Sequence, residues 1–285
     1  MKALACELPA TTGLPLARWQ SPDLARAAIE SGIVASISGT TIWRWLSDDA
    51  IKPWQHRSWI FPRDPRFAVK ATRVLDLYAR RFDGKPLRHD EYVISADEKT
   101  SIQARIRKHP TTPPAPGRPM RVEHEYTRGG ALAYLAAWDV HQATVFGRCE
   151  DTSGIAPFDR LVDHVMTTEP NTSARTVYWV VDNGSSHRGQ ASVDRLEGRW
   201  PTLRLIHLPV HASWLNQVEI YFSVVQRKVV TPNDSTDLDQ LAARLLDFQD
   251  YYQQIAAPFQ WKFTKADLHD LLARIATHDA AALAA

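Results

Sequence analysis

Three carboxylates stand in local settings that suit metal chemistry. Asp97 closes the strand-like run 91–97, and Asp182 closes a second run, 176–182, just before Asn-Gly-Ser-Ser-His. Glu219 falls within a helix-like run at 214–230. Carboxylate oxygens are the hard ligands that Mg²⁺ prefers, and a pair of such ions can cleave a phosphodiester. The trio therefore predicts a divalent-metal site that acts on nucleic acid.

Each acid taken alone has an ordinary alternative. The chain holds 32 acidic residues, so Asp at a strand end is common, and Asp-Asn-Gly at 182–184 is also a strong turn signal. Two strand ends would nevertheless place Asp97 and Asp182 together at the carboxyl edge of one sheet. In the run 214–230 apolar residues step by three and four, which puts Glu219 and Asn216 on a polar flank. The acids carry weight jointly, as one constellation.

The pattern after residue 90 is typical of a mixed α/β domain, with helices packed on a sheet. Strands are predicted at 91–97, near 101–107, and at 131–139, 143–149, 176–182 and 203–208. Helices are predicted at 156–166, 189–199, 214–230, 236–254 and 264–277. Five prolines fall between residues 108 and 119, so this stretch is predicted to be an extended basic loop between the early strands.

The N-terminal part predicts a small all-α helix-turn-helix. A first helix begins near Ser21 and ends at Gly32, and a second helix is capped by Ser38. The apolar stripes are Leu24, Ala28 and Ile29 on the first helix and Ile42, Trp45 and Leu46 on the second. The outward positions of the second helix would face a DNA major groove, and these are Thr40, Thr41, Trp43 and Arg44. Plain packing of two short helices would give the same pattern.

A basic, proline-interrupted segment follows. Residues 52–66 mix Arg, including Arg57, with Lys and Trp, which suits a linker lying along a DNA backbone or one packed on a neighbouring domain. Residues 67–82 read as a helix. We therefore expect a helix-turn-helix region at 1–51, a linker and helix at 52–88, and an α/β domain at 89–285.

Composition and charge distribution indicate where the protein is expected to act more clearly than which reaction it catalyses. The net charge of +2 favours no partner, but residues 1–90 hold 14 basic against 9 acidic side chains, and residues 99–130 hold 7 against 2. Such clusters suit phosphate backbones or a solvated face. Cys6 and Cys149 are too few for a disulfide framework or a zinc site. No apolar run approaches the roughly 20 residues of a membrane span, and no signal peptide is visible. We expect a cytoplasmic, nucleoid-associated protein.

Local motifs around the three acids carry a family resemblance. Residues 181–187, Val-Asp-Asn-Gly-Ser-Ser-His, resemble the second-acid motif of DDE transposases in the mariner-like superfamily of insertion sequences. Residues 208–219, which end in Leu-Asn-Gln-Val-Glu, resemble the third-acid motif, and residues 95–100 resemble the first. The three motifs occur in the family's order, behind a helix-turn-helix.

The resemblance implies an RNase H-like core and a specific activity. Such enzymes bind terminal inverted repeats, cleave both strands with water and join the 3′-OH to a TA target. It implies that Asp97, Asp182 and Glu219 hold two Mg²⁺ or Mn²⁺ ions. His187, Asn216 and Lys99 would be outer-sphere or DNA-contacting groups, although His187 also suits a satisfied core histidine.

The same resemblance implies an assembly. The basic loop 108–128 resembles a clamp loop that braces a homodimer on DNA. Of the two helix-turn-helix units usual in the family, the chain shows only the second, so we expect the first to be lacking.

Two other functions remain open on sequence alone. One is another RNase H-like nuclease, such as a resolvase, that cuts without strand transfer. The other is a transposon-derived DNA-binding protein that no longer cleaves. The helix-turn-helix disfavours the first, and the complete acid trio disfavours the second. A serine hydrolase is unsupported because no Gly-x-Ser-x-Gly elbow occurs.

Overall fold

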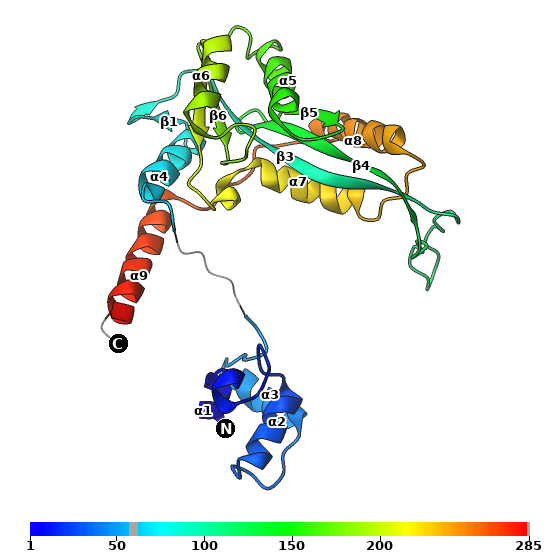
Figure 1. Ribbon diagram of the computed structural model, residues 1–285, viewed down its shortest axis with the longest axis vertical. Helices are drawn as coiled ribbons and strands as arrows, with labels where there is room; N and C mark the ends of the chain where they lie inside the picture. The colour runs from blue at the N-terminus through cyan, green and yellow to red at the C-terminus, as the bar shows by residue number, and fades with distance from the viewer. Residues whose placement is uncertain (57–61, 284–285) are drawn as a thin grey trace. The chain divides into compact units, whose positions relative to one another are not determined.

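The computed structural model describes residues 1–56 and 62–283, and the chain divides into two compact units between Phe61 and Pro62 (Figure 1). Arg57, expected to contact DNA, lies outside the described residues. Among the residues described, no helix is both long and apolar enough to cross a bilayer.

The N-terminal unit is a small helical domain. It contains α1 (Lys2–Cys6), a 3₁₀ turn (Pro9–Thr12), α2 (Ser21–Glu30) and α3 (Gly39–Asp48). Ser38 caps α3, because its hydroxyl accepts a hydrogen bond from the backbone N–H of Thr41 at 3.1 Å. The core of this unit gathers Ala5, Trp19, Leu24, Ala25, Ala27, Ile42 and Leu46. Both helices of the expected helix-turn-helix are therefore present.

Two of the residues predicted to lie on the buried apolar stripes are exposed, so the prediction is wrong for them. Ile29 is 41% exposed and Trp45 is 46% exposed. The small side chains of Ala25 and Ala27 form much of the buried face of α2, which leaves Ile29 outside the contact. On α3 only Ile42 and Leu46, four residues apart, are buried, so Trp45 falls at the edge.

The second unit is built on a five-stranded sheet in the order β5-β4-β3-β6-β7. The strands are β3 (Glu91–Ile106), β4 (Thr127–Asp139), β5 (Val145–Glu150), β6 (Thr176–Val181) and β7 (Leu203–His207). β4 is antiparallel to both β3 and β5, whereas β3, β6 and β7 run parallel. A separate hairpin pairs β1 (Arg81–Phe82) with β2 (Lys85–Pro86). The predicted mixed sheet flanked by helices is confirmed.

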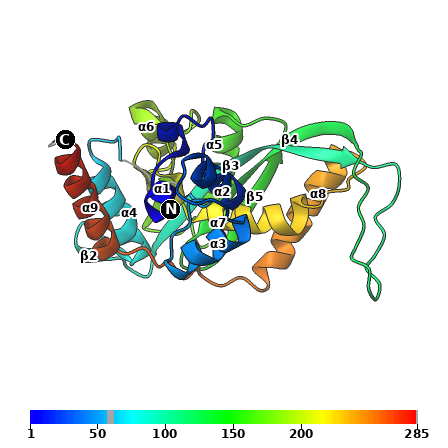
Figure 2. The same cartoon turned by 90° about the horizontal axis from the view of Figure 1, so that it is seen from below.

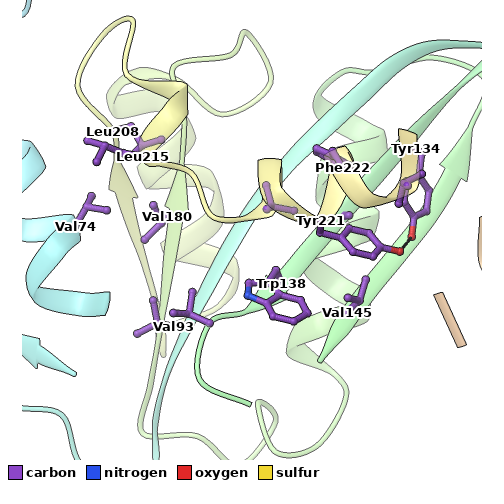
Figure 3. Close-up of a cluster of buried hydrophobic side chains, with 14 of the residues drawn as sticks. Val74, Val93, Tyr134, Trp138, Val145, Val180, Leu208, Leu215, Tyr221 and Phe222 are labelled. Atoms are coloured by element: carbon purple, nitrogen blue, oxygen red, sulfur yellow. Dashed lines mark hydrogen bonds between the residues drawn. The ribbon is translucent and has the colours of Figure 1, made fainter. Parts of the chain in front are cut away.

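Helices cover both faces of the sheet. One face carries α5 (Ile155–Met166) and α6 (Gly189–Arg199), which bury Phe158, Leu161 and Leu196 among others. The opposite face carries α4 (Phe67–Tyr78), α7 (Val218–Val225) and α8 (Leu238–Gln253), whose core is seen in Figure 3. The last helix, α9 (Lys265–Leu283), lies beside α4 (Figures 1 and 2).

Three elements differ from their predicted form. The helix expected at 67–82 ends at Tyr78, and Arg81–Phe82 instead forms strand β1 of the hairpin. The strands expected at 91–97 and near 101–107 are one strand, β3, with a bulge between Lys99 and Ile102 where Ser101 takes a left-handed φ of 58°. The helix expected at 214–230 is broken into a 3₁₀ turn (Ser213–Leu215), α7 and a π-helical turn (Gln226–Val230). Asn216 is extended between the first two pieces, with φ −82° and ψ 112°, because its side chain bonds to β3. It is therefore not on the polar flank of a helix.

Gly147 in β5 tests the packing on this face. A methyl group at this position would collide with the Tyr134 ring and hydroxyl and with Gln249 Oε1, all of which are buried. We expect Gly147→Ala to lower the free energy of unfolding by about 1–3 kcal/mol, measured by urea denaturation. Gly198→Ala is the matched control, because no heavy atom lies within 4 Å of its added methyl and it sits in helix α6. It should be neutral or stabilise by up to about 1 kcal/mol, and an equal loss in both variants would contradict the packing argument.

Candidate active site

The three acids gather at one edge of the sheet. Pairing of the parallel strands β3 and β6 sets Ser95 opposite Val180, so Asp97 and Asp182 follow at equivalent positions on neighbouring strands. Glu219 lies in the first turn of α7, which packs against β3. The three carboxylates lie close enough to interact electrostatically, because the charges of Asp182 and Glu219 both raise the pKa of the Asp97 carboxyl. The structure thus brings together the acids that the sequence singled out.

Asp97 is the most buried of the three, with 8% of its surface exposed. Burial, followed by the charge of Asp182, raises its pKa to about 7. Its Oδ1 accepts a hydrogen bond from the Glu98 N–H at 2.8 Å, and its Oδ2 accepts one from Asn216 Nδ2 at 3.1 Å. Both oxygens are therefore oriented by protein donors.

Asn216 connects the third-acid region to the first acid. Its Nδ2 also donates to the carbonyl of Ala96 at 3.1 Å, and its Oδ1 accepts from the hydroxyl of Ser95. The Ser95 oxygen in turn accepts from the N–H of Val218, the first residue of α7, at 2.9 Å. This buried network fixes the start of α7 against β3.

Asp182 is held by a different set of donors. Its Oδ1 accepts hydrogen bonds from the Gly184 N–H at 2.6 Å and from His187 Nε2 at 2.7 Å. The His187 hydrogen bond lowers the pKa of Asp182 against the opposing effect of burial. A carboxylate only accepts, so Nε2 carries the proton, and His187 Nδ1 then accepts from the Ser186 hydroxyl at 2.9 Å. His187 is fully buried against Phe158 and has no surface to offer DNA.

Lack of space for a side chain explains the glycine at position 184. A Cβ on Gly184 would lie 3.0 Å from both Asp182 Oδ1 and His187 Nε2, which is tighter than ordinary van der Waals contact. The close backbone approach is what allows the Gly184 N–H to reach the carboxylate.

Glu219 is the exposed member of the trio. Burial of its carboxyl and the charge of Asp182 raise its pKa, while the nearby ammonium of Lys99 lowers it. Lys99, half-buried on β3, thus lies close enough to act on the third acid.

Three participating side chains were missed by sequence reasoning. They are Ser95, Ser186 and Glu98. Ser95 had a usable signal, because it shares the inward face of β3 with Val93 and Asp97, and a buried hydroxyl there needs a partner. Glu98 is on the other face of β3, where burial and the charge of Asp182 raise its pKa while His187 opposes the rise.

The chemistry of the donor set suits a hard divalent cation. Within the part of the chain that the structure describes, no group of three or more His, Cys, Asp or Glu side chains is placed so that it could hold a metal ion. The pKa values of Asp97 and Glu219 are raised first by burial and then by repulsion from the charge of Asp182. A cation between them would relieve this repulsion, and Mg²⁺ keeps several waters, so it does not require a closed cage.

Comparison with known proteins decides the family. Residues 92–242, just over half of the chain, match the family described as DDE superfamily endonuclease. The chain belongs to this family. All three acids of this DDE endonuclease lie inside the matched segment. Among curated proteins, none matches its sequence significantly.

Solved structures show the same fold. The Mos1 transposase paired-end complex with left transposon end is 14% identical, with a TM-score of 0.54 over 96% of this chain and 76% of that chain. The Mos1 mariner paired-end complex with Mn is 15% identical, with a TM-score of 0.53 over 95% and 76%. The Mos1 strand transfer complex is 14% identical, with a TM-score of 0.52 over 96% of this chain and 76% of that chain. The DDE endonuclease therefore has the RNase H-like fold of Mos1 transposase, as the sequence predicted.

The raised pKa of Asp97 predicts how stability depends on pH. Its pKa is about 7 in the folded protein against an ordinary 3.8, so the folded state binds more protons between these values. This group's contribution therefore makes the metal-free protein less stable as pH rises from about 4 through 7. Asp97→Asn removes the buried charge, which destabilises the folded protein by up to about 4 kcal/mol at high pH. The new amide also faces the amide of Asn216, and this less favourable hydrogen bond costs about 1 kcal/mol.

We expect Asp97→Asn to be about 1–3 kcal/mol more stable than the wild type at pH 8, with the difference shrinking toward pH 4. Urea unfolding in a chelator measures this. Asp151→Asn, at an exposed acid, is the control, and a pH-independent difference for Asp97→Asn would contradict the assignment.

Proposed function

We propose that this DDE endonuclease is a mariner-type transposase that cleaves DNA at transposon ends and joins the ends to target DNA. The observation that carries the proposal is the convergence of Asp97, Asp182 and Glu219 at one sheet edge, within the segment that matches the endonuclease family. The likeness to Mos1 complexes named for a transposon end and for strand transfer supports it.

The proposed chemistry needs divalent metal. Asp97, Asp182 and Glu219 would hold two Mg²⁺ or Mn²⁺ ions, which when bound would activate first water and then the 3′-OH and stabilise the leaving oxygen. Two related Mos1 complexes are named for Mn and for Mg. The protein's own part is orientation: Asn216 holds Asp97, and His187 with Gly184 holds Asp182. Lys99 would meet a DNA phosphate beside Glu219.

DNA recognition would use α3. Thr40, Trp43 and Arg44 are exposed on this helix, whereas Thr41 is partly occupied by its contact with Ser38. On this proposal the exposed side chains read the terminal inverted repeats from the major groove.

The basic loop 108–128, which connects β3 to the start of β4 and is called here the arm, would brace a homodimer on two transposon ends. It is extended, with two isolated antiparallel bridges, Thr112 to Arg121 and Ala115 to Arg118. At its base Arg105 and Arg107 stack on Tyr126, with 4.9 and 5.5 Å from guanidinium carbon to ring centroid. The join would be made at a TA dinucleotide in the target.

Isosteric changes in the trio test the catalytic assignment. Asp97→Asn, Asp182→Asn and Glu219→Gln should each lower Mg²⁺- or Mn²⁺-dependent cleavage by at least about a thousandfold, because a lost metal ligand removes several kcal/mol of transition-state stabilisation. Binding to the same DNA should stay within about threefold. The substrate is the DNA that flanks the protein's own gene, with cut positions mapped. Asp151→Asn should cleave normally, and full cleavage by any trio variant would remove that residue from the site.

The cut positions separate the three functions. Cuts at inverted-repeat ends followed by joining support the transposase. Cuts confined to branched junctions would favour a resolvase. Tight binding with no cleavage by the wild type would favour a DNA-binding protein without activity.

Arg44 tests the proposed recognition helix. Arg44→Ala should weaken binding to inverted-repeat DNA by about 1–3 kcal/mol and reduce the dependence of affinity on salt, measured by fluorescence anisotropy at several salt concentrations. Lys2→Ala is the control, since Lys2 is already paired with Asp49 at 2.8 Å. Equal effects of the two changes would mean that general charge, and not α3, accounts for binding.

A further inference from the structure

The segment that delivers Glu219 is irregular and is held by contacts from elsewhere. Residues 208–217, between β7 and α7, contain only one short 3₁₀ turn, and His211 takes a left-handed φ of 60°. A non-glycine residue in that conformation costs of order 1 kcal/mol and persists where surrounding contacts enforce it. This segment, residues 208–217, is called here the third-acid loop.

Tyr78 contacts the loop at its C-terminal end. It is the last residue of α4, and its hydroxyl donates a hydrogen bond to the carbonyl of Leu215 at 2.8 Å. The ring is fixed edge-on against Trp261 with centroids 5.3 Å apart. The residue after Leu215 is Asn216, which reaches Asp97. Tyr78 therefore acts one residue away from the link between the acids.

Asp64 contacts the loop near its start. Its Oδ2 accepts a hydrogen bond from the N–H of Val210 at 3.1 Å and pairs with Lys70 Nζ at 2.7 Å. Its Oδ1 accepts from the N–H of Arg66 at 2.9 Å, and the side chain is buried. The carboxylate is thus fixed by its own neighbours and presents one oxygen to the loop.

Both contacts come from the chain upstream of the family-matched segment 92–242. Apolar packing runs alongside them, because Val74 of α4 faces Leu208 and Leu215 of the loop (Figure 3). We propose that Tyr78 and Asp64 are positioning residues for the third acid, which hold the third-acid loop so that Asn216 meets Asp97 and α7 starts where Glu219 faces the other carboxylates. This rests on the proposed function, since it concerns the same three acids.

The expected effect is on metal binding and on the chemical step. If the Leu215 carbonyl moves, Asn216 and the first turn of α7 move with it, and the three carboxylates no longer share one cation well. Loss of a supporting group of this kind costs about tenfold or more in metal affinity or activity. DNA affinity should not change in Tyr78→Phe, because Tyr78 lies outside α3, the basic segment 52–66 and the arm.

The experiment compares Tyr78→Phe with Tyr178→Phe. The first removes only the hydroxyl that binds Leu215. The second removes the hydroxyl of Tyr178, a buried residue of β6 in the same core, whose ring packs on Phe82 with centroids 4.6 Å apart. Asp64→Ala is a second variant, which removes the other contact with the loop. Three quantities are measured on the full chain: Mn²⁺ affinity from the electron paramagnetic resonance of free Mn²⁺, kcat and KM for end cleavage, and amide exchange of residues 213–219 without metal.

The proposal expects Tyr78→Phe and Asp64→Ala to raise the Mn²⁺ dissociation constant about tenfold and to lower kcat about tenfold, with KM within about twofold. Exchange at 213–219 should quicken in both. Tyr178→Phe should leave all three quantities at their wild-type values. Wild-type values in Tyr78→Phe and Asp64→Ala would overturn the proposal, as would an equal shift in Tyr178→Phe, which would indicate general loosening of the core.

Failure of the proposed function would look different. A wild-type protein that neither binds Mn²⁺ nor cleaves end DNA would refute the metal-dependent transposase. In that case amide exchange still decides the inference, because it reports the loop in the metal-free protein. Unchanged exchange in Tyr78→Phe would then overturn it.

Discussion

Carboxylates held at a half-buried sheet edge, where burial and mutual repulsion both disfavour their charges, are the constraint on which this structure depends. Burial of Asp97, followed by the nearby charges of Asp182, Glu98 and Glu219, raises its pKa to about 7. Such an arrangement is unfavourable without a cation, so it must be imposed by the rest of the fold. The sheet imposes the first part, because parallel pairing of β3 and β6 leaves two strand ends side by side. Hydrogen bonds impose the remainder.

Each acid is held by a different set of interactions, and these interactions give the three carboxylates different charge states and exposure. Asp182 is kept ionised by donors to one oxygen, which leaves the other oxygen without a competing protein donor among the described residues. Asp97 is kept close to protonation by burial, and Asn216 orients it. Glu219 is exposed and stands on a helix whose start is fixed by Ser95. Two carboxylates are thus rigid, and the third lies on the element that faces solvent. A site of this kind gives up stability for function.

Local sequence pattern predicted the sheet and the acids but not the side-chain network. Strand ends and turn signals are local, so Asp97 and Asp182 could be placed from residues within a few positions of each. The break at Asn216 could not, because the helix is interrupted by bonds to Ala96 and Asp97, about 120 positions away in the chain. Ile29 and Trp45 were misplaced for a related reason: helical periodicity locates a stripe but not its edge. Tyr78 carried no signal at all, since its partner is a backbone carbonyl 137 positions away.

The same long-range dependence means that residues 92–242, which carry the family signature, do not contain everything that forms the site. One face of the sheet is closed by Phe67, Ala71, Val74, Leu75 and Leu77 from α4, and also by Leu268 from α9. Burial of each large apolar side chain contributes about 1.5–3 kcal/mol, so the four large side chains of α4 contribute an amount comparable to a typical domain's whole margin of stability. Asp76 and Lys265 join these two helices by an ion pair at 2.5 Å. The flanking helices are therefore part of the fold that carries the three acids, and the third-acid loop is contacted from both sides of the signature segment, by Tyr78 upstream and Phe263 downstream.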